Sequence, residues 1–458
     1  MPYLLFGPRI RLFRRFRIVT MAVRTIVVLL LASTCLAQTT VGTNSNPPDD
    51  IAALTVQANQ GKPDAQLKLG DAYLRGRGVI QNNAEAVRWF RTAADEGNAD
   101  AQYTLGSLYA TGIAVPRDDA EATKWFQRAA ENGSAEAQYN MGVRYAYGRG
   151  VPKDDRQAAA WFRKSAEQGL ARGQLGLAAG YANGLGLPLD KGEALRWYTK
   201  AAEQGMAEAQ TQMGIIFHDG DGTSVNYPQA MLWFEKAASQ KNGDAEFNLG
   251  LMYEHGQGVE RSFAKAADYY HLAIEHGSAP ALSNLGSLYQ YGRGVPQDQQ
   301  QAINFYTLAA EKGVFTAQSY LAGAYLSGNG VAKDAVRGAK WMQLAAAHGN
   351  AEAECNLAIL YQTGTGVPQS FNDALIWYGK AAEQGFAKAQ HNLGALYGNG
   401  QGIPKDFVKA YKWLTLAKES GYRDSQQALD WLKPQMTAEQ ITQAQTLADE
   451  WAKDHRAR

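Results

Sequence analysis

The sequence predicts an all-α fold, a right-handed superhelical solenoid of ten 36-residue helix-turn-helix repeats with capping helices. Three columns of residues recur every 36 residues without insertion or deletion, and together they predict this fold. The first column is aromatic: Trp89, Trp125, Trp161, Trp197, Trp233, Tyr269, Phe305, Trp341, Trp377 and Trp413. The second is Tyr73, Tyr109, Tyr145, Tyr181, Phe217, Tyr253, Tyr289, Tyr325, Tyr361 and Tyr397. The third is Gly76, Gly112, Gly148, Gly184, Gly220, Gly256, Gly292, Gly328, Gly364 and Gly400.

The first 37 residues precede this array and read as a secretory signal peptide. Arg24 gives a positive start, residues 26–31 are an apolar run, and Ala37 ends a stretch suited to cleavage. The apolar run is too short to cross a bilayer comfortably. Met21 is an alternative start of translation, because residues 1–20 would make an unusually long positive region. We therefore expect a periplasmic or secreted protein whose mature chain does not span a membrane.

Cys35 permits a second interpretation of this segment, as a lipidated cysteine. Bacterial lipoprotein sites usually carry leucine three residues before the cysteine, and Leu31 lies one position too early. An uncleaved anchor is a further alternative. Removing residues 1–37, which hold six arginines and no acidic residue, leaves 39 basic and 44 acidic residues and a net charge of −5. This balance gives no reason to expect nucleic-acid binding.

Residues 38–60 are expected to form a linker and an amino-terminal capping helix, with Leu54 and Ala58 in the frame of a second repeat helix. The ten repeats are expected over residues 61–421. In each, an apolar stripe at helical spacing predicts a first helix, as for Ala137, Met141 and Tyr145. Gly142 on that helix allows a neighbouring helix to approach closely. A glycine- and proline-containing turn then leads to the second helix.

Residues 422–458 are expected to form the carboxy-terminal capping helices. A first helix carries Trp431 as its large apolar residue, and Pro434 stops it. Thr437 and Gln440 have the spacing of a capping box and predict the start of a last helix. Because one helical hairpin cannot bury its apolar faces alone, such helices are needed to cover both ends of the stack.

The repeat pattern resembles the Sel-1-like repeat, a relative of the tetratricopeptide repeat. Residues 137–170 show it: AQYNMGVRYAYGRGVPKDDRQAAAWFRKSAEQGL. The resemblance implies a non-enzymatic adaptor or scaffold that binds a protein or an extended peptide in the concave groove of the array. It also implies a setting in envelope regulation or host interaction. One cysteine-rich branch of the family is associated with penicillin-like compounds, but only Cys355 follows residue 37 here.

Two columns on the first helices are the candidate groove lining. The first, here called the asparagine column, comprises Asn140, Asn248, Asn284, Asn356 and Asn392. The second, the aromatic column, comprises Tyr147, His255 and Tyr291. Asparagine amides can pair with a peptide backbone through donor and acceptor, and nearby aromatic rings supply contact area. The alternative is that the asparagines satisfy backbone groups between adjacent repeats.

A third column on the first helices is too uniform for specificity and is interpreted as structural. It contains Gln66, Gln102, Gln138, Gln174, Gln210, Gln318 and Gln390.

Two short matches to catalytic or metal-binding motifs occur at positions that belong to the repeat pattern. Ser262 and Lys265 match S-x-x-K, but no partner motif follows, and Ser262 stands where a second helix begins. Asp219 and Asp221 hint at a calcium loop, but the twelfth position is alanine. Cys355 is expected to be a small, half-buried residue. We therefore expect no catalytic residue, no metal site and no cofactor, and no enzymatic activity.

An enzyme that acts on the cell wall or binds β-lactams is the alternative function. It would need a cluster of polar residues that departs from the repeat consensus. A regulatory periplasmic partner of a membrane sensor is a variant of the adaptor hypothesis. A eukaryotic quality-control subunit usually carries a carboxy-terminal membrane anchor, and the polar residues 449–458 argue against one.

Overall fold

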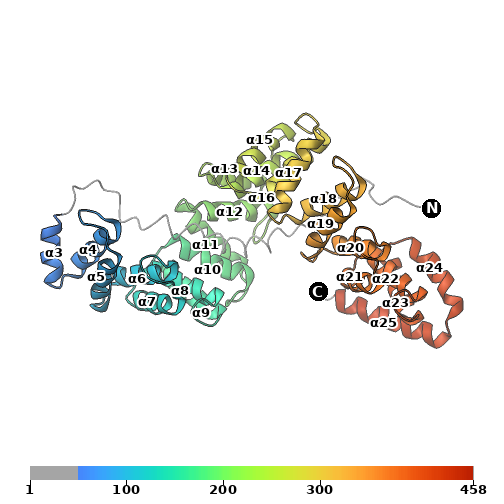
Figure 1. The fold of residues 1–458 in the computed structure, drawn as a ribbon, viewed down its shortest axis with the longest axis horizontal. Helices are drawn as coiled ribbons and strands as arrows, with labels where there is room; N and C mark the ends of the chain where they lie inside the picture. The colour runs from blue at the N-terminus through green and yellow to red at the C-terminus, as the bar shows by residue number, and fades with distance from the viewer. Residues whose placement is uncertain (1–49, 457–458) are drawn as a thin grey trace. The chain divides into compact units, whose positions relative to one another are not determined.

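The computed structural model describes residues 50–456 of the chain. The expected signal peptide at residues 1–37, the alternative start at Met21 and Cys35 all lie outside the described residues. Over residues 50–456 the fold is all-α, with 23 α-helices, one 3-10 helix and no strand (Figure 1). The all-α architecture and the ten 36-residue repeats predicted from the three columns are confirmed.

Each repeat consists of two antiparallel helices. The first helices are α4 (Pro63–Arg75), α6 (Ala99–Thr111), α8 (Ala135–Tyr147), α10 (Ala171–Asn183), α12 (Ala207–Asp219), α14 (Gly243–His255), α16 (Ala279–Tyr291), α18 (Phe315–Ser327), α20 (Ala351–Thr363) and α22 (Ala387–Asn399). The second helices are α5 (Asn83–Asp95), α7 (Asp119–Glu131), α9 (Asp155–Glu167), α11 (Lys191–Glu203), α13 (Tyr227–Ala238), α15 (Phe263–Glu275), α17 (Gln299–Glu311), α19 (Ala335–Ala346), α21 (Phe371–Glu383) and α23 (Phe407–Glu419).

Polar caps and one glycine column set the helix boundaries. The residue before every second helix is Asp, Asn or Ser, and its side chain accepts a backbone N–H of the first turn, as Asp154 does from Arg156 and Gln157. The third column of glycines ends the first helices with φ between 64° and 82°. Only glycine adopts this left-handed conformation without strain, which explains why this column is invariant along the chain.

Close packing between the two helices of a repeat depends on a second glycine. At Gly142 on α8, the ring of Phe162 on α9 lies where a side chain would start, and an added Cβ would be 2.5 Å from Phe162 Cδ1. The expected close approach at Gly142 is therefore present. Beside it, Trp161 is partly buried and lies under a lysine, with Lys164 Nζ 4.0 Å from the ring centroid.

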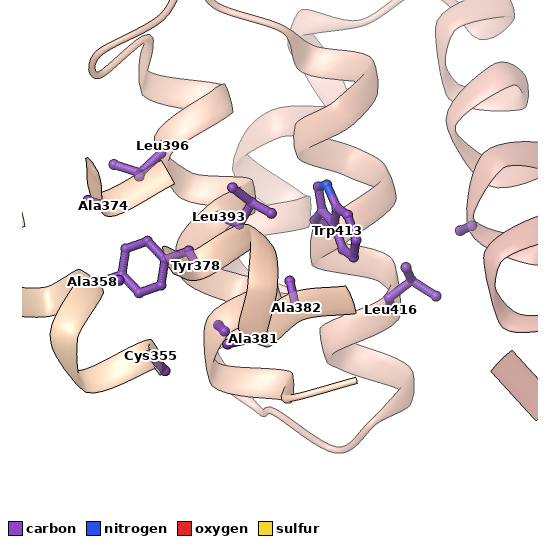
Figure 2. Packing of buried hydrophobic residues seen from close by; sticks show 12 residues of the cluster. Cys355, Ala358, Ala374, Tyr378, Ala381, Ala382, Leu393, Leu396, Trp413 and Leu416 are labelled. Atoms are coloured by element: carbon purple, nitrogen blue, oxygen red, sulfur yellow. The ribbon is translucent and has the colours of Figure 1, made fainter. Parts of the chain in front are cut away.

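The described residues form two compact units, 50–249 and 250–456. In the amino-terminal unit (residues 50–249), apolar side chains from successive helix pairs make a chain of small cores, such as that around Phe90, Leu105 and Trp125. The carboxy-terminal unit (residues 250–456) is built in the same way. Figure 2 shows one of its cores, where Tyr378, Leu393 and Trp413 pack with small alanines.

Additional helices pack against both ends of the repeats. Helix α3 (Ile51–Asn59) buries Leu54 and Ala58 against the first repeat. After the tenth repeat come α24 (Asp424–Leu432), η1 (Lys433–Gln435) and α25 (Ala438–Arg456). Trp431 is exposed, and Leu429 and Leu432 fill the core of α24 instead.

The last helix starts as its capping box predicts. Thr437 N–H donates to Gln440 Oε1 at 3.0 Å, and Gln440 N–H donates to Thr437 Oγ1 at 3.2 Å. Further along α25, Trp451 packs edge-on against Trp413, with the ring centroids 6.0 Å apart. Helix α25 thus covers the apolar face of α23.

Candidate partner-binding surface

The asparagine column lies half-buried on the first helices, and most of its amides are held in place. Asn140 Nδ2 donates to Glu136 O at 2.9 Å, and Asn248 Nδ2 donates to Asp244 O at 2.7 Å, each within its own helix. Asn284 Nδ2 donates to the Tyr270 hydroxyl at 3.1 Å. These bonds differ from the alternative expected above, because none of them reaches a backbone group of an adjacent repeat. They fix the orientation of each amide.

The two remaining members of the column lie in the carboxy-terminal unit. Asn392 lies beside the Tyr378 hydroxyl. Asn356 on α20 is also half-buried, and its side chain makes no hydrogen bond within residues 50–455. A half-exposed amide that offers both a donor and an acceptor can pair with a peptide group. Asn356 is therefore the member of the column whose amide is most available to a partner.

The aromatic column lies at the carboxyl ends of first helices and is exposed. Tyr147 is 36% exposed and Tyr291 is 43% exposed. An arginine from the following turn lies near each ring, with Arg149 Cζ 5.8 Å from the Tyr147 centroid and Arg293 Cζ 5.0 Å from the Tyr291 centroid. His255, at the end of α14, is exposed as well.

The structure brings members of the two columns together on single helices. Asn140 and Tyr147 are seven residues apart on α8, and Asn284 and Tyr291 are seven residues apart on α16. Seven residues are about two helical turns, so each pair lies on one face of its helix, about 10 Å apart. The amino-terminal unit and the carboxy-terminal unit each carry such a pair.

Sequence reasoning missed a column of buried tyrosines on the second helices. In the carboxy-terminal unit their hydroxyls donate to the residue sixteen positions earlier: Tyr270 to Glu254 Oε2 at 2.5 Å, Tyr306 to Gln290 Oε1 at 3.1 Å and Tyr378 to Gln362 Oε1 at 2.7 Å. Burial raises the pKa of all three hydroxyls, so they stay protonated and act as donors. The signal was present in the sequence, since Glu or Gln accompanies Tyr at this spacing.

The glutamine column is structural, as predicted. Gln138 on α8 is buried, and its Nε2 donates to Ala130 O of the preceding repeat at 3.1 Å. The same bond to the preceding repeat recurs for Gln66, Gln102, Gln210, Gln318 and Gln390. The buried Nε2 groups of this column therefore connect adjacent repeats.

The motifs set aside in the sequence have structural roles. Ser262 caps α15, because its Oγ accepts the Lys265 N–H at 3.3 Å. Asp221 forms an ion pair with Lys191 Nζ at 2.8 Å, and Asp219 lies 2.6 Å from His218 Nδ1. Across residues 50–456 no group of three or more His, Cys, Asp or Glu side chains is placed to hold a metal ion.

The expectation that Cys355 is half-buried is wrong, because this side chain is fully buried in the core shown in Figure 2. Ala358 and Tyr378 belong to the same core and exclude water from it. Burial raises the pKa of the Cys355 thiol to about 12. The thiol is therefore protonated at neutral pH and is not a nucleophile.

The comparison with protein families decides what this chain is. The Sel1 repeat matches ten times, at residues 63–98, 99–134, 135–170, 171–206, 207–242, 243–278, 279–314, 316–350, 351–386 and 387–422. The chain belongs to the Sel1 repeat family. The resemblance to the Sel-1-like repeat inferred from the three columns is thereby confirmed.

Solved structures include two Sel1 repeat proteins with 32% sequence identity to this one. One is a protective antigen of uropathogenic Escherichia coli, where the match covers 88% of this chain and 94% of that chain with a TM-score of 0.47. The other is a Sel1 repeat protein from Oxalobacter formigenes, with 73% and 93% covered and a TM-score of 0.55. An immunity protein from Pseudomonas aeruginosa matches at 22% identity, with 46% and 81% covered and a TM-score of 0.33. No curated protein matches the chain.

Proposed function

We propose that this Sel1 repeat protein is a non-enzymatic adaptor or scaffold that binds a protein or an extended peptide along its first helices. The observation that carries the proposal is the recurrence of asparagine at one position of five first helices and of an aromatic side chain seven residues later on three of them. Repeat arrays use surfaces of this kind for extended partners.

The geometry of the amides suits a peptide backbone. Asn140 and Asn248 are oriented by bonds to their own helices, so a partner does not have to order these side chains when it binds. Tyr147 offers a large, stiff ring about two turns from Asn140, and Tyr291 offers one about two turns from Asn284.

We also propose that the protein is exported to the periplasm or secreted. The support is the arrangement of Arg24, the apolar residues 26–31 and Ala37 in the sequence. Within residues 50–456 there is no helix with the length and apolar character needed to cross a membrane. Mass spectrometry of the protein recovered from cells tests this directly. A mature chain that begins at Gln38 supports export, whereas an acylated Cys35 or an uncleaved amino terminus contradicts the cleavage proposed here.

The adaptor proposal is tested by affinity capture with a triple variant, Asn248→Ala, Asn284→Ala and Asn356→Ala. Mass spectrometry identifies the proteins held by the wild type. A matched control, Gln229→Ala, Asn304→Ala and Asn372→Ala, removes three exposed polar side chains from second helices. Circular dichroism verifies that both variants keep their helices.

The two variants separate a binding surface from general stickiness. We expect a partner that the wild type and the control retain and the test variant loses. Equal retention by all three proteins would place the partner elsewhere on the surface. If wall fragments or small molecules bound and no polypeptide did, the adaptor proposal would be wrong.

A further inference from the structure

The buried tyrosine column has a fourth member, Tyr198 on α11, in the amino-terminal unit. Its hydroxyl has no partner like those of the other three, because the residue sixteen positions earlier is Ala182. Alanine is too short to reach it, and the Tyr198 hydroxyl makes no hydrogen bond within residues 50–455. The space that Gln290 and Gln362 fill in their own repeats is left open here.

A pocket of about 40 Å³ occupies this space between α10, α11 and α12. Its lining includes Ala182, Ala194, Tyr198, Gln212, Ile216 and Asp219. Tyr198, Ala194 and Ile216 are buried and form its inner wall, whereas Asp219 is exposed at its mouth. The volume is too small for a metabolite and matches the end group of one side chain.

The inner wall carries two polar groups without partners. One is the Tyr198 hydroxyl, and the other is Gln212 Nε2, which is buried and has no hydrogen-bond partner. Gln212 stands at the position of the asparagine column in the fifth repeat, so the pocket opens on the proposed partner-binding surface. A buried donor without a partner destabilises the free protein, and a ligand that supplies an acceptor removes this cost.

The charges at the mouth select against a carboxylate. Lys191 Nζ is committed, because it donates to Ala182 O and to Asp221 Oδ2, both at 2.8 Å. The two negative charges of Asp219 and Asp221 exceed the one positive charge of Lys191, so the mouth of the pocket is negative. Other repeats show the same matching of charge. Arg293 stands at the position equivalent to Asp221 where Glu254 fills the site, and neutral Asn329 stands there where Gln290 does.

The geometry points to a pocket that takes the carboxamide end of a glutamine or asparagine side chain from the partner. This inference rests on the proposed function and names the chemistry of one contact. The carboxamide oxygen accepts from Gln212 Nε2 and from the Tyr198 hydroxyl. A lysine side chain has no acceptor for Gln212, and a leucine side chain satisfies neither group. The chain itself shows the fit, because the Gln290 and Gln362 carboxamides already accept tyrosine hydroxyls in their repeats.

A small probe tests the pocket without any knowledge of the partner. N-acetyl-L-glutamine N-methylamide is titrated into the full protein with ¹³C-labelled isoleucine methyl groups, and the Ile215 and Ile216 signals are followed. The corresponding glutamate, lysine and leucine derivatives serve as comparisons. We expect saturable shifts of these two signals with the glutamine probe and at least about ten-fold weaker binding of the other three.

Two variants make the test specific. Ala182→Gln copies the seventh and ninth repeats, should fill the pocket, and should abolish the shifts. Tyr198→Phe copies the phenylalanine of the third repeat and should weaken binding of the glutamine probe several-fold. No shift at Ile215 and Ile216, or equal shifts with all four probes, would overturn the inference. Since no partner protein is involved, such a result is distinct from a failure of affinity capture.

Discussion

Gln168 Nε2 lies 2.8 Å from Gln138 Oε1, and this bond joins the second helix of the third repeat to its first helix. Gln168 Nε2 also donates to Gly133 O at 3.0 Å, and Gln138 Nε2 donates to Ala130 O at 3.1 Å. Gly133 and Ala130 belong to the preceding repeat. Two side-chain amides therefore connect both helices of one repeat to the end of the repeat before it, and they fix the register of the stack.

Gln138→Ala should destabilise the protein by about 1–3 kcal/mol, because it removes a buried hydrogen bond and leaves the Gln168 amide short of a partner. Native-state hydrogen exchange of α8 and α9 measures the local effect, which suits a long array better than a single melting curve. Asn140→Ala, two residues away on the same helix, is the control. It removes the partly exposed Asn140 amide, whose Nδ2 donates to Glu136 O of its own helix, and should change stability by a few tenths of a kcal/mol. Equal effects of the two variants would contradict a structural role for the glutamine column.

The structural role of the glutamine column could be predicted from the sequence. A residue that recurs at one position in most repeats meets a packing or hydrogen-bonding requirement that those repeats share. The same argument predicted the ten repeats and their helices. Contacts that differ from repeat to repeat are harder to predict. Whether Asn284 bonds to its own helix or to Tyr270 depends on the residue on a neighbouring helix, and a single column cannot show that.

Gly142→Ala should destabilise the array by about 1–3 kcal/mol through overpacking. The Phe162 ring has no room to move away, because it lies against glycines of two helices: an added Cβ would be 2.5 Å from Phe162 Cδ1 at Gly142 on α8 and 2.7 Å from it at Gly176 on α10. Gly379→Ala on α21 is the matched control, since nothing lies within 4 Å of its added Cβ. For Gly379→Ala we expect the free energy of unfolding to rise by about 0.5–1 kcal/mol, because alanine has the higher helix propensity. Urea titrations of both variants test the opposite signs, and a loss of stability in both would contradict the packing argument.

Lys241→Gly should stabilise the protein by about 0.5–1 kcal/mol. Lys241 has a φ of 63°, a left-handed conformation that costs a residue with a side chain about 1–2 kcal/mol. Nine other repeats carry glycine at this position, and part of the gain is offset because glycine loses more entropy on folding. Thermal unfolding of the variant beside the wild type measures the change. An unchanged or lower midpoint would mean that the Lys241 side chain contributes a contact that outweighs the strain.

The pocket beside Tyr198 shows why part of the candidate site could not be predicted. Ala182, Tyr198 and Gln212 belong to three columns that each read as ordinary variation. Their meaning appears only when α10, α11 and α12 pack and bring them around one space. The depth of Cys355 has the same origin, because its burial depends on the α21 residues Ala374 and Tyr378 as well as on its own helix.

Cys355 should not react with thiol reagents in the folded protein at pH 8. Burial raises its pKa to about 12, so the thiolate is scarce, and the side chain is inaccessible. Labelling followed by intact-mass spectrometry should show modification only after urea unfolds the carboxy-terminal unit. Cys355→Ser should be less stable, because it buries a hydroxyl in an apolar core. Rapid stoichiometric labelling without denaturant would contradict the burial described here.

Acidification should loosen α24, because His391 on α22 is held in its neutral form. Its Nδ1 lies 3.0 Å from Ser425 Oγ, and its ring centroid lies 4.9 Å from that of Tyr422. Burial lowers the pKa of His391 below its ordinary value of 6.5, an effect that the nearby Asp424 carboxylate partly opposes. Folding therefore favours the neutral ring. Its stabilising contribution is complete above about pH 6.5 and is lost as the pH falls through the lower value of the folded state.

Hydrogen exchange of the α24 amides at pH 7.5 and pH 5, corrected for the intrinsic pH dependence of exchange, measures this loss. His391→Gln keeps a polar side chain that can reach Ser425 but does not titrate. The variant should therefore show the same protection of α24 at both pH values. A wild type with equal protection at both, or a variant that loses protection as the wild type does, would assign the acid sensitivity to other groups. Because the effect is expected only where α24 packs on α22, the amides of α8 serve as an internal reference.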